Sequence, residues 1–91
     1  MENQIQPDHE VNFRINSLKK MIESCYAYGG AEKQTYNFNR YILPYETELG
    51  RSLFEKVYKE HLQNLKQNFE IRENVYTDNE GGMYNSLEPK V

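Results

Sequence analysis

The chain has 91 residues, a formal net charge of −3 and a mean hydropathy of −0.95. A chain this short buries only about 60 to 65 per cent of its unfolded surface, so we expect one small core. The acidic balance argues against a nucleic-acid partner, because affinity for phosphate comes largely from clustered Lys and Arg. No signal-peptide core and no apolar run near about 18 residues is present, so we expect a cytoplasmic protein without a membrane span.

Two further features of the composition bear on partners and origin. Cys25 is the single cysteine, which excludes an internal disulfide and fits a reducing compartment. Only 37% of the residues are hydrophobic, so a protein partner, a homo-dimer or a higher oligomer is an expected source of additional burial. Residues with AT-rich codons outnumber those with GC-rich codons, which is typical of a low-GC genome and of its phages and mobile elements.

The first predicted helix runs from Asp8 to Tyr28, after a flexible N-terminal arm of residues 1–7. Pro is tolerated in a first helical turn and Asp can cap free backbone N–H groups, so Pro7 and Asp8 suit a helix entrance. Gly29-Gly30 should end the helix, because glycine adopts the left-handed C-terminal conformation easily. Apolar residues recur at spacings of four and three on one helix face: Val11, Ile15, Leu18, Ile22 and Cys25.

The segment YNFNRYILPY, from Tyr36 to Tyr45, lies in a predicted connector that is irregular or partly helical. Tyr, Arg and Asn are enriched at recognition surfaces, because they offer contact area and hydrogen bonds with few rotors to freeze. The candidate partner-binding residues are therefore Tyr36, Asn37, Phe38, Arg40, Tyr41 and Tyr45. The segment could instead cover the open side of two helices. Partner binding and covering of the helices can also occur together. In that case Phe38, Ile42 and Leu43 would point inward, and Tyr36, Arg40 and Tyr41 would point outward.

A second helix is predicted from Tyr45 to Asn68. Pro44 suits its first turn, where Glu46 and Glu48 would lie near the positive end of the helix dipole. Gly50 is interpreted as a tolerated residue within this helix, where it reduces helix stability by up to about 1 kcal/mol relative to Ala. The apolar face consists of Leu49, Leu53, Phe54, Val57, Tyr58, Leu62 and Leu65. The opposite, solvated face consists of Glu48, Arg51, Glu55 and Lys59.

Beyond Phe69 a period of two replaces the helical spacing, which is typical of a strand. The run from Asp78 to Gly82 is a turn signal. We therefore predict a short hairpin or extended segment from Glu70 to Leu87, in competition with a helix that continues to Tyr76. Residues 88–91 are interpreted as a tail.

No catalytic or metal-binding pattern stands out. Cys25 lies on the apolar helix face, where a thiol behaves as a small hydrophobe with a raised pKa. His9 and His61 lie on different elements without the paired spacing of metal ligands, and we expect both at the surface. We therefore predict no enzyme, no metal and no cofactor.

Together these patterns predict a mostly α single domain over residues 8–87: an antiparallel two-helix hairpin with an aromatic connector and a short C-terminal hairpin or extended segment. The predicted function is a small non-enzymatic cytosolic protein-interaction module. It would act as a regulator, adaptor or inhibitor by binding a larger protein, with a phage or mobile-element modulator as one instance. The alternative is a small-ligand or single-stranded nucleic-acid binding module, in which the Tyr/Phe/Arg cluster holds a planar group.

Overall fold

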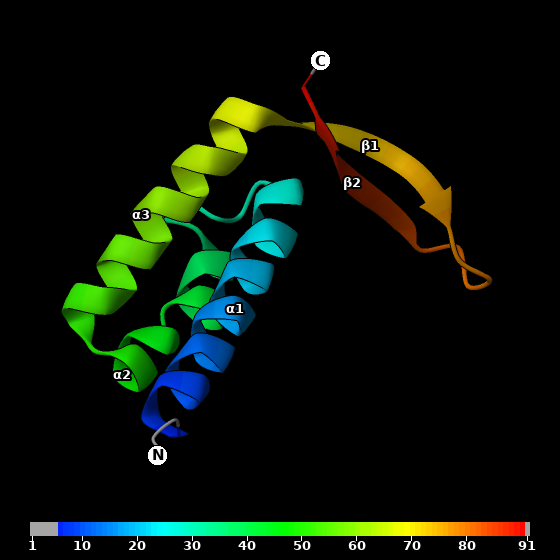
Figure 1. Ribbon diagram of the computed structural model, residues 1–91. Helices are drawn as coiled ribbons and strands as arrows, with labels where there is room; N and C mark the ends of the chain where they lie inside the picture. The colour runs from blue at the N-terminus through cyan, green and yellow to red at the C-terminus, as the bar shows by residue number, and fades with distance from the viewer. Residues whose placement is uncertain (1–5, 91) are drawn as a thin grey trace.

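The computed structural model describes residues 6–90 and is mostly helical, with a short two-stranded antiparallel sheet (Figure 1). Its elements in chain order are α1 (Gln6–Ala27), the π-helical turn η2 (Phe38–Ile42), α2 (Tyr45–Leu49), α3 (Arg51–Asn68), β1 (Phe69–Thr77) and β2 (Met83–Pro89). Residues 1–5 of the predicted flexible arm lie outside the described residues, whereas Gln6 and Pro7 already belong to α1. No helix within residues 6–90 is long and apolar enough to cross a membrane.

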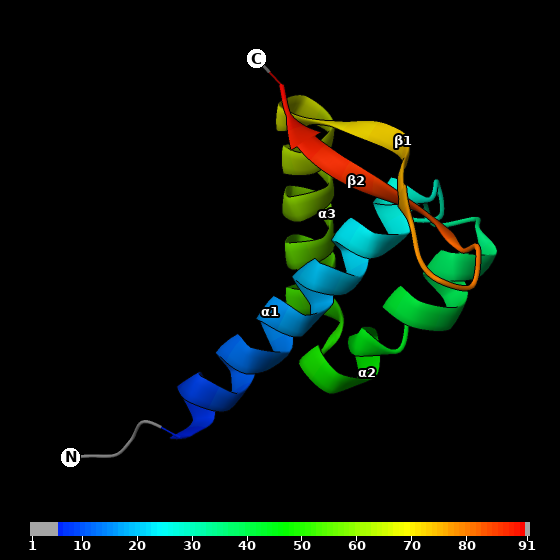
Figure 2. The same ribbon diagram turned by 90° about the vertical axis from the view of Figure 1, so that its right-hand side faces the viewer.

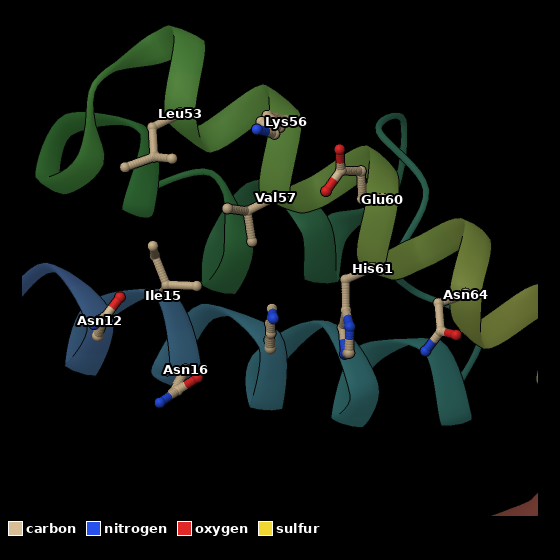
Figure 3. Close-up of a pocket in the computed structure, with 10 residues that line it drawn as sticks. Asn12, Ile15, Asn16, Leu53, Lys56, Val57, Glu60, His61 and Asn64 are labelled. Atoms are coloured by element: carbon tan, nitrogen blue, oxygen red, sulfur yellow. The ribbon is translucent and has the colours of Figure 1, made fainter.

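The two long helices, α1 and α3, pack together and run in the same direction (Figure 1; Figure 2). Ile15 points toward Leu53 at one end of this contact (Figure 3), and Glu23 bonds to His61 farther along. The prediction of an antiparallel two-helix hairpin is therefore wrong. Residues 28–50 do not form a simple reversal, because they carry the chain back along α1 through η2 and α2 before α3 begins.

The core lies between α1, α3 and η2. Leu18 and Ile22 of α1 pack there with Ile42 of η2 and Phe54 of α3, all almost fully buried. The predicted apolar faces of both helices are confirmed over most of their length. Val11 is the exception and is exposed, because the first turns of α1 extend past the region that α3 covers (Figure 2).

An aromatic cluster ties the connector to α3. The ring of Phe38 lies edge-on to Tyr58 with centroids 5.1 Å apart, and Tyr58 stacks on Phe54 at 6.0 Å. The hydroxyl of Tyr58 donates to the carbonyl oxygen of Ala31 at 2.8 Å, which satisfies the polar end of a buried side chain. Burial raises the pKa of Tyr58 to about 12, so this hydroxyl remains a donor at neutral pH.

The helix predicted from Tyr45 to Asn68 is divided at Gly50 into α2 and α3. Gly50 has φ 88°, a conformation that L side chains rarely adopt. Its N–H donates to Glu46 O at 2.9 Å to end α2, and its carbonyl accepts from Phe54 N at 2.9 Å to begin α3. The interpretation of Gly50 as tolerated within a continuous helix is therefore wrong, since this glycine makes a corner.

The C-terminal segment forms the predicted hairpin, and the competing prediction of a helix to Tyr76 is wrong. Helix α3 ends at Asn68 because Phe69 is already extended, at φ −133°. Ile71 pairs with Leu87 in the antiparallel register. Glu88 and Pro89, predicted as tail, also pair within the sheet.

An irregularity in the hairpin register coincides with its attachment to α1. The register shifts between Arg72 and Tyr76, where Asn74 has φ 55°. Asn74 N donates to the side-chain oxygen of Asn85 at 3.1 Å, and the Asn85 side-chain nitrogen donates to Ala27 O at 2.7 Å. Asn85 therefore holds both the irregular part of β1 and the last turn of α1.

Candidate functional site

The predicted site is built on the π-helical turn η2. Leu43 N donates to Phe38 O at 2.9 Å, a bond that spans one residue more than an α-helical bond. The hydroxyl of Thr35 fixes the backbone just before this turn. It accepts a hydrogen bond from Phe38 N at 3.2 Å and donates one to Gly30 O at 2.8 Å. Such turns are rare and frequently occur at functional sites.

The six predicted partner-binding residues divide between the surface and the core. Tyr36 and Tyr41 are 69% and 42% exposed, and Arg40 is exposed as well, so the predicted outward group is confirmed in its orientation. Phe38 is only 3% exposed and supports the surface from beneath, so it offers almost no area to a partner. Tyr45 is half-buried and packs against the core.

The predicted inward and outward groups do not include Asn37 and place Leu43 incorrectly. Asn37 is half-buried, and a Cβ at Gly30 would lie 2.5 Å from its own Cβ, so Asn37 fills the space that this glycine leaves. Leu43 was predicted to point inward but is exposed, because it follows η2 at the edge of the core beside Pro44.

Arg40 lies between the two exposed tyrosines. Its guanidinium carbon is 5.9 Å from the ring centroid of Tyr36 and 5.5 Å from that of Tyr41. Cation–π contacts at exposed sites contribute about 0.5 to 1 kcal/mol each, which restrains a long side chain before any partner binds. We call Tyr36, Arg40 and Tyr41 the Tyr–Arg surface.

A small apolar hollow of about 240 Å³ adjoins this surface between α1 and η2. We call it the Tyr41 hollow, and its lining residues are Met21, Ser24, Cys25, Tyr28, Asn37 and Tyr41. Cys25 is buried, so the prediction of a core cysteine is confirmed, and burial raises the pKa of its thiol. The hollow is smaller than a typical small-molecule pocket and matches the size of one side chain.

A larger groove of about 660 Å³ runs between α1 and α3 (Figure 3). Its rim carries Asn16 and Lys19 of α1, and Lys56, Glu60 and Asn64 of α3. His61 closes one part of it, with its side chain 13% exposed and its Nε2 atom 2.9 Å from a carboxylate oxygen of Glu23. The prediction that His61 is a surface residue is therefore wrong, because the parallel arrangement of the helices places Glu23 opposite it.

Within residues 6–90, no group of three or more His, Cys, Asp or Glu side chains is arranged to hold a metal ion. The chain matches no known protein-family model, no curated protein and no solved structure. Its function is therefore inferred from the chemistry of its own surface.

Proposed function

We propose that the protein is a small non-enzymatic cytosolic interaction module, a regulator, adaptor or inhibitor that binds a larger protein through the Tyr–Arg surface. The observation that carries this proposal is the exposed stack of Arg40 between Tyr36 and Tyr41 beside an apolar hollow. Tyr and Arg are the residue types that contribute most often to binding energy at protein interfaces, together with Trp.

The side chains and backbone of the Tyr–Arg surface are already held in place before a partner binds, which supports the same proposal. The side chain of Arg40 is restrained by two rings, and the backbone of η2 is held by the bonds of Leu43 and Thr35. A partner that binds here loses little conformational entropy in ordering these groups, which favours affinity. The Tyr41 hollow offers a place for one apolar side chain of that partner.

The experiment compares the tagged chain with the double variant Arg40→Ala/Tyr41→Ala in affinity capture from a low-GC bacterial lysate, with and without nuclease. The control is Lys59→Ala/Gln63→Ala, which alters exposed residues of α3 outside the Tyr–Arg surface. We expect a stoichiometric protein that survives nuclease and is retained by the wild type and the control. Loss of an interface hot spot corresponds to about 2 kcal/mol or more, so the purified partner should bind the double variant roughly 30-fold more weakly.

Equal retention of that protein by the double variant would contradict the proposal, provided that circular dichroism gives the same helicity for all three chains. Binding only to itself would instead favour a homo-oligomer, which sedimentation at high micromolar concentration tests directly. A monomer at that concentration would count against self-association.

The second candidate is a module that holds a planar ligand or single-stranded nucleic acid. The exposed rings of Tyr36 and Tyr41 favour it, since aromatic side chains with an adjacent arginine can stack on unpaired bases. Captured material that disappears after nuclease treatment, and that the Arg40→Ala/Tyr41→Ala variant does not bind, would support this candidate over a protein partner.

A further inference from the structure

Strand β2 passes over the C-terminal end of α1 (Figure 2). Another hollow, of about 440 Å³, lies between the hairpin and this end of α1. Ala27, Tyr28 and Gly29 line it from below. Alternate residues of the hairpin, Ile71, Glu73 and Met83 among them, line it from the other side. We call this space the hairpin hollow.

The surroundings of the hairpin hollow are electrically negative. A helix carries the negative end of its dipole at its C-terminus, and the last turn of α1 contains no basic residue to balance it. The carboxylate of Glu73 lies on the opposite wall and makes no ion pair with the part of the chain that the structure describes. Residues 69–89 carry five carboxylates and one arginine, a net charge of −4.

The rest of the lining of the hairpin hollow combines the polar side chains of Asn74 and Asn85 with apolar and aromatic side chains. Met83 is 56% exposed, and Ile71 and Tyr28 are exposed beside it. The Tyr28 hydroxyl accepts a hydrogen bond from Asn85 N at 2.9 Å, which fixes the position of its ring. Methylene groups pack favourably on such walls, while a cation is attracted to the face of an aromatic ring.

The hairpin is held in shape without a ligand. The Asp78 carboxylate accepts hydrogen bonds from Glu80 N at 2.9 Å, Gly82 N at 2.7 Å and the Tyr84 hydroxyl at 2.6 Å. These bonds, led by that of Tyr84, lower the pKa of Asp78 and keep the turn closed. Because Asn85 also joins the hairpin to α1, the hairpin hollow exists before binding.

We propose that the hairpin hollow binds the Lys or Arg side chain of a partner protein. Its methylene stem would lie against Ile71 and Met83, and its charged head near Glu73 and the end of α1. This proposal rests on the function proposed above. Tyr28 lines both this hollow and the Tyr41 hollow, so a single partner can reach both sites.

The test is a titration of the isotope-labelled chain with N-acetyl-arginine N-methylamide, followed by NMR amide shifts. The neutral citrulline counterpart has nearly the same shape and serves as the ligand control. We expect shifts centred on Tyr28, Gly29 and Glu73. We expect roughly fivefold weaker binding of the citrulline compound, the upper range for one exposed ion pair.

Two variants assign the charge effect to one carboxylate. Glu73→Gln should reduce affinity for the arginine compound toward that of the citrulline compound. Glu80→Gln removes a carboxylate from the turn of the same hairpin but not from the hollow, and affinity should stay within about twofold because distant exposed charges are screened.

The proposal would be overturned by no binding in the hairpin hollow, by equal binding of both compounds, or by equal binding of the arginine compound to Glu73→Gln and the wild type. Tighter binding of spermidine at the same amides would assign the site to free polyamines and would also overturn it. The Arg40→Ala/Tyr41→Ala variant should bind the arginine compound like the wild type. The NMR titration therefore tests binding in the hairpin hollow, and the affinity capture separately tests binding at the Tyr–Arg surface.

Discussion

At the scale of single residues, Tyr58 shows how one hydroxyl joins distant parts of the chain. It lies on α3 and donates to Ala31 O in the connector, and both residues are buried. Its ring also supports Phe38 beneath the Tyr–Arg surface. The candidate binding surface therefore depends on a buried core residue.

Removal of this hydroxyl in Tyr58→Phe should destabilise the protein by about 1 to 3 kcal/mol, because the carbonyl of Ala31 is left buried without its donor. Chemical denaturation followed by circular dichroism measures the change in the free energy of unfolding. Tyr41→Phe is the control, since its side chain is exposed and should change stability by less than about 0.5 kcal/mol. Equal stability of Tyr58→Phe and the wild type would show that the hydrogen bond contributes nothing.

The same residue predicts an alkaline limit to stability. The pKa of Tyr58 is raised from an ordinary value of 10.0 to about 12, so the folded state favours the protonated phenol. This stabilisation is fully present below pH 10 and is lost as the pH rises from 10 toward 12. Denaturation midpoints across that range should fall in the wild type and fall less steeply in Tyr58→Phe.

At the scale of elements, Gly50 decides whether residues 45–68 form one helix or two. Its φ of 88° ends α2 and lets α3 begin in a new direction. No atom within 4 Å would meet an added Cβ, so the effect of a substitution comes from the backbone conformation rather than from a clash.

Gly50→Ala should therefore destabilise the protein by about 1 to 3 kcal/mol, the cost of holding an L residue in an extended backbone conformation with positive φ that is almost restricted to glycine. A continuous helix would give the opposite sign, since Ala is favoured over Gly within a helix by up to about 1 kcal/mol. Thermal or chemical unfolding measures the sign directly. Ser52→Ala, an exposed substitution in the first turn of α3, is the matched control.

At the scale of the whole molecule, the position of the hairpin creates the hairpin hollow. A two-stranded hairpin is marginally stable alone in water, so this one depends on its contacts with the helices. Phe69 and Leu87 pack against the core at its base, and Asn85 bonds to the end of α1. We therefore expect the helical body to fold without the bonds of Asn85, and the position of the hairpin over α1 to depend on them.

Asn85→Ala should leave the helices intact and loosen the hairpin. We expect faster hydrogen exchange in β1 and β2, unchanged exchange in the core of α1 and α3, and loss of binding of the arginine compound in the hairpin hollow. Asn79→Ala, in the exposed turn, is the control. Unchanged exchange in the hairpin of Asn85→Ala would contradict this account of how the hairpin is held.

Part of the candidate site could be predicted from residue type, because Phe and Ile are buried more often than Tyr and Arg. Phe38 and Ile42 are buried and Tyr36 and Tyr41 are exposed, as predicted. The hairpin hollow could not be predicted in this way. Glu73 belongs to a strand whose distance from α1 depends on how the helices pack, and no local pattern carries that information.

The sequence by itself determined the features with a local cause: the buried face around Leu18 and Ile22, the turn from Asp78 to Gly82, and the division of the connector into inward and outward residues with the exception of Leu43. Only the tertiary structure decided the parallel course of α3, the contact of Glu23 with His61, and the hollow beneath the hairpin. The physical reason is that periodicity and backbone preference act over a few residues. The direction of α3 depends instead on the path of residues 28–50, which is set by burial of the connector against both helices.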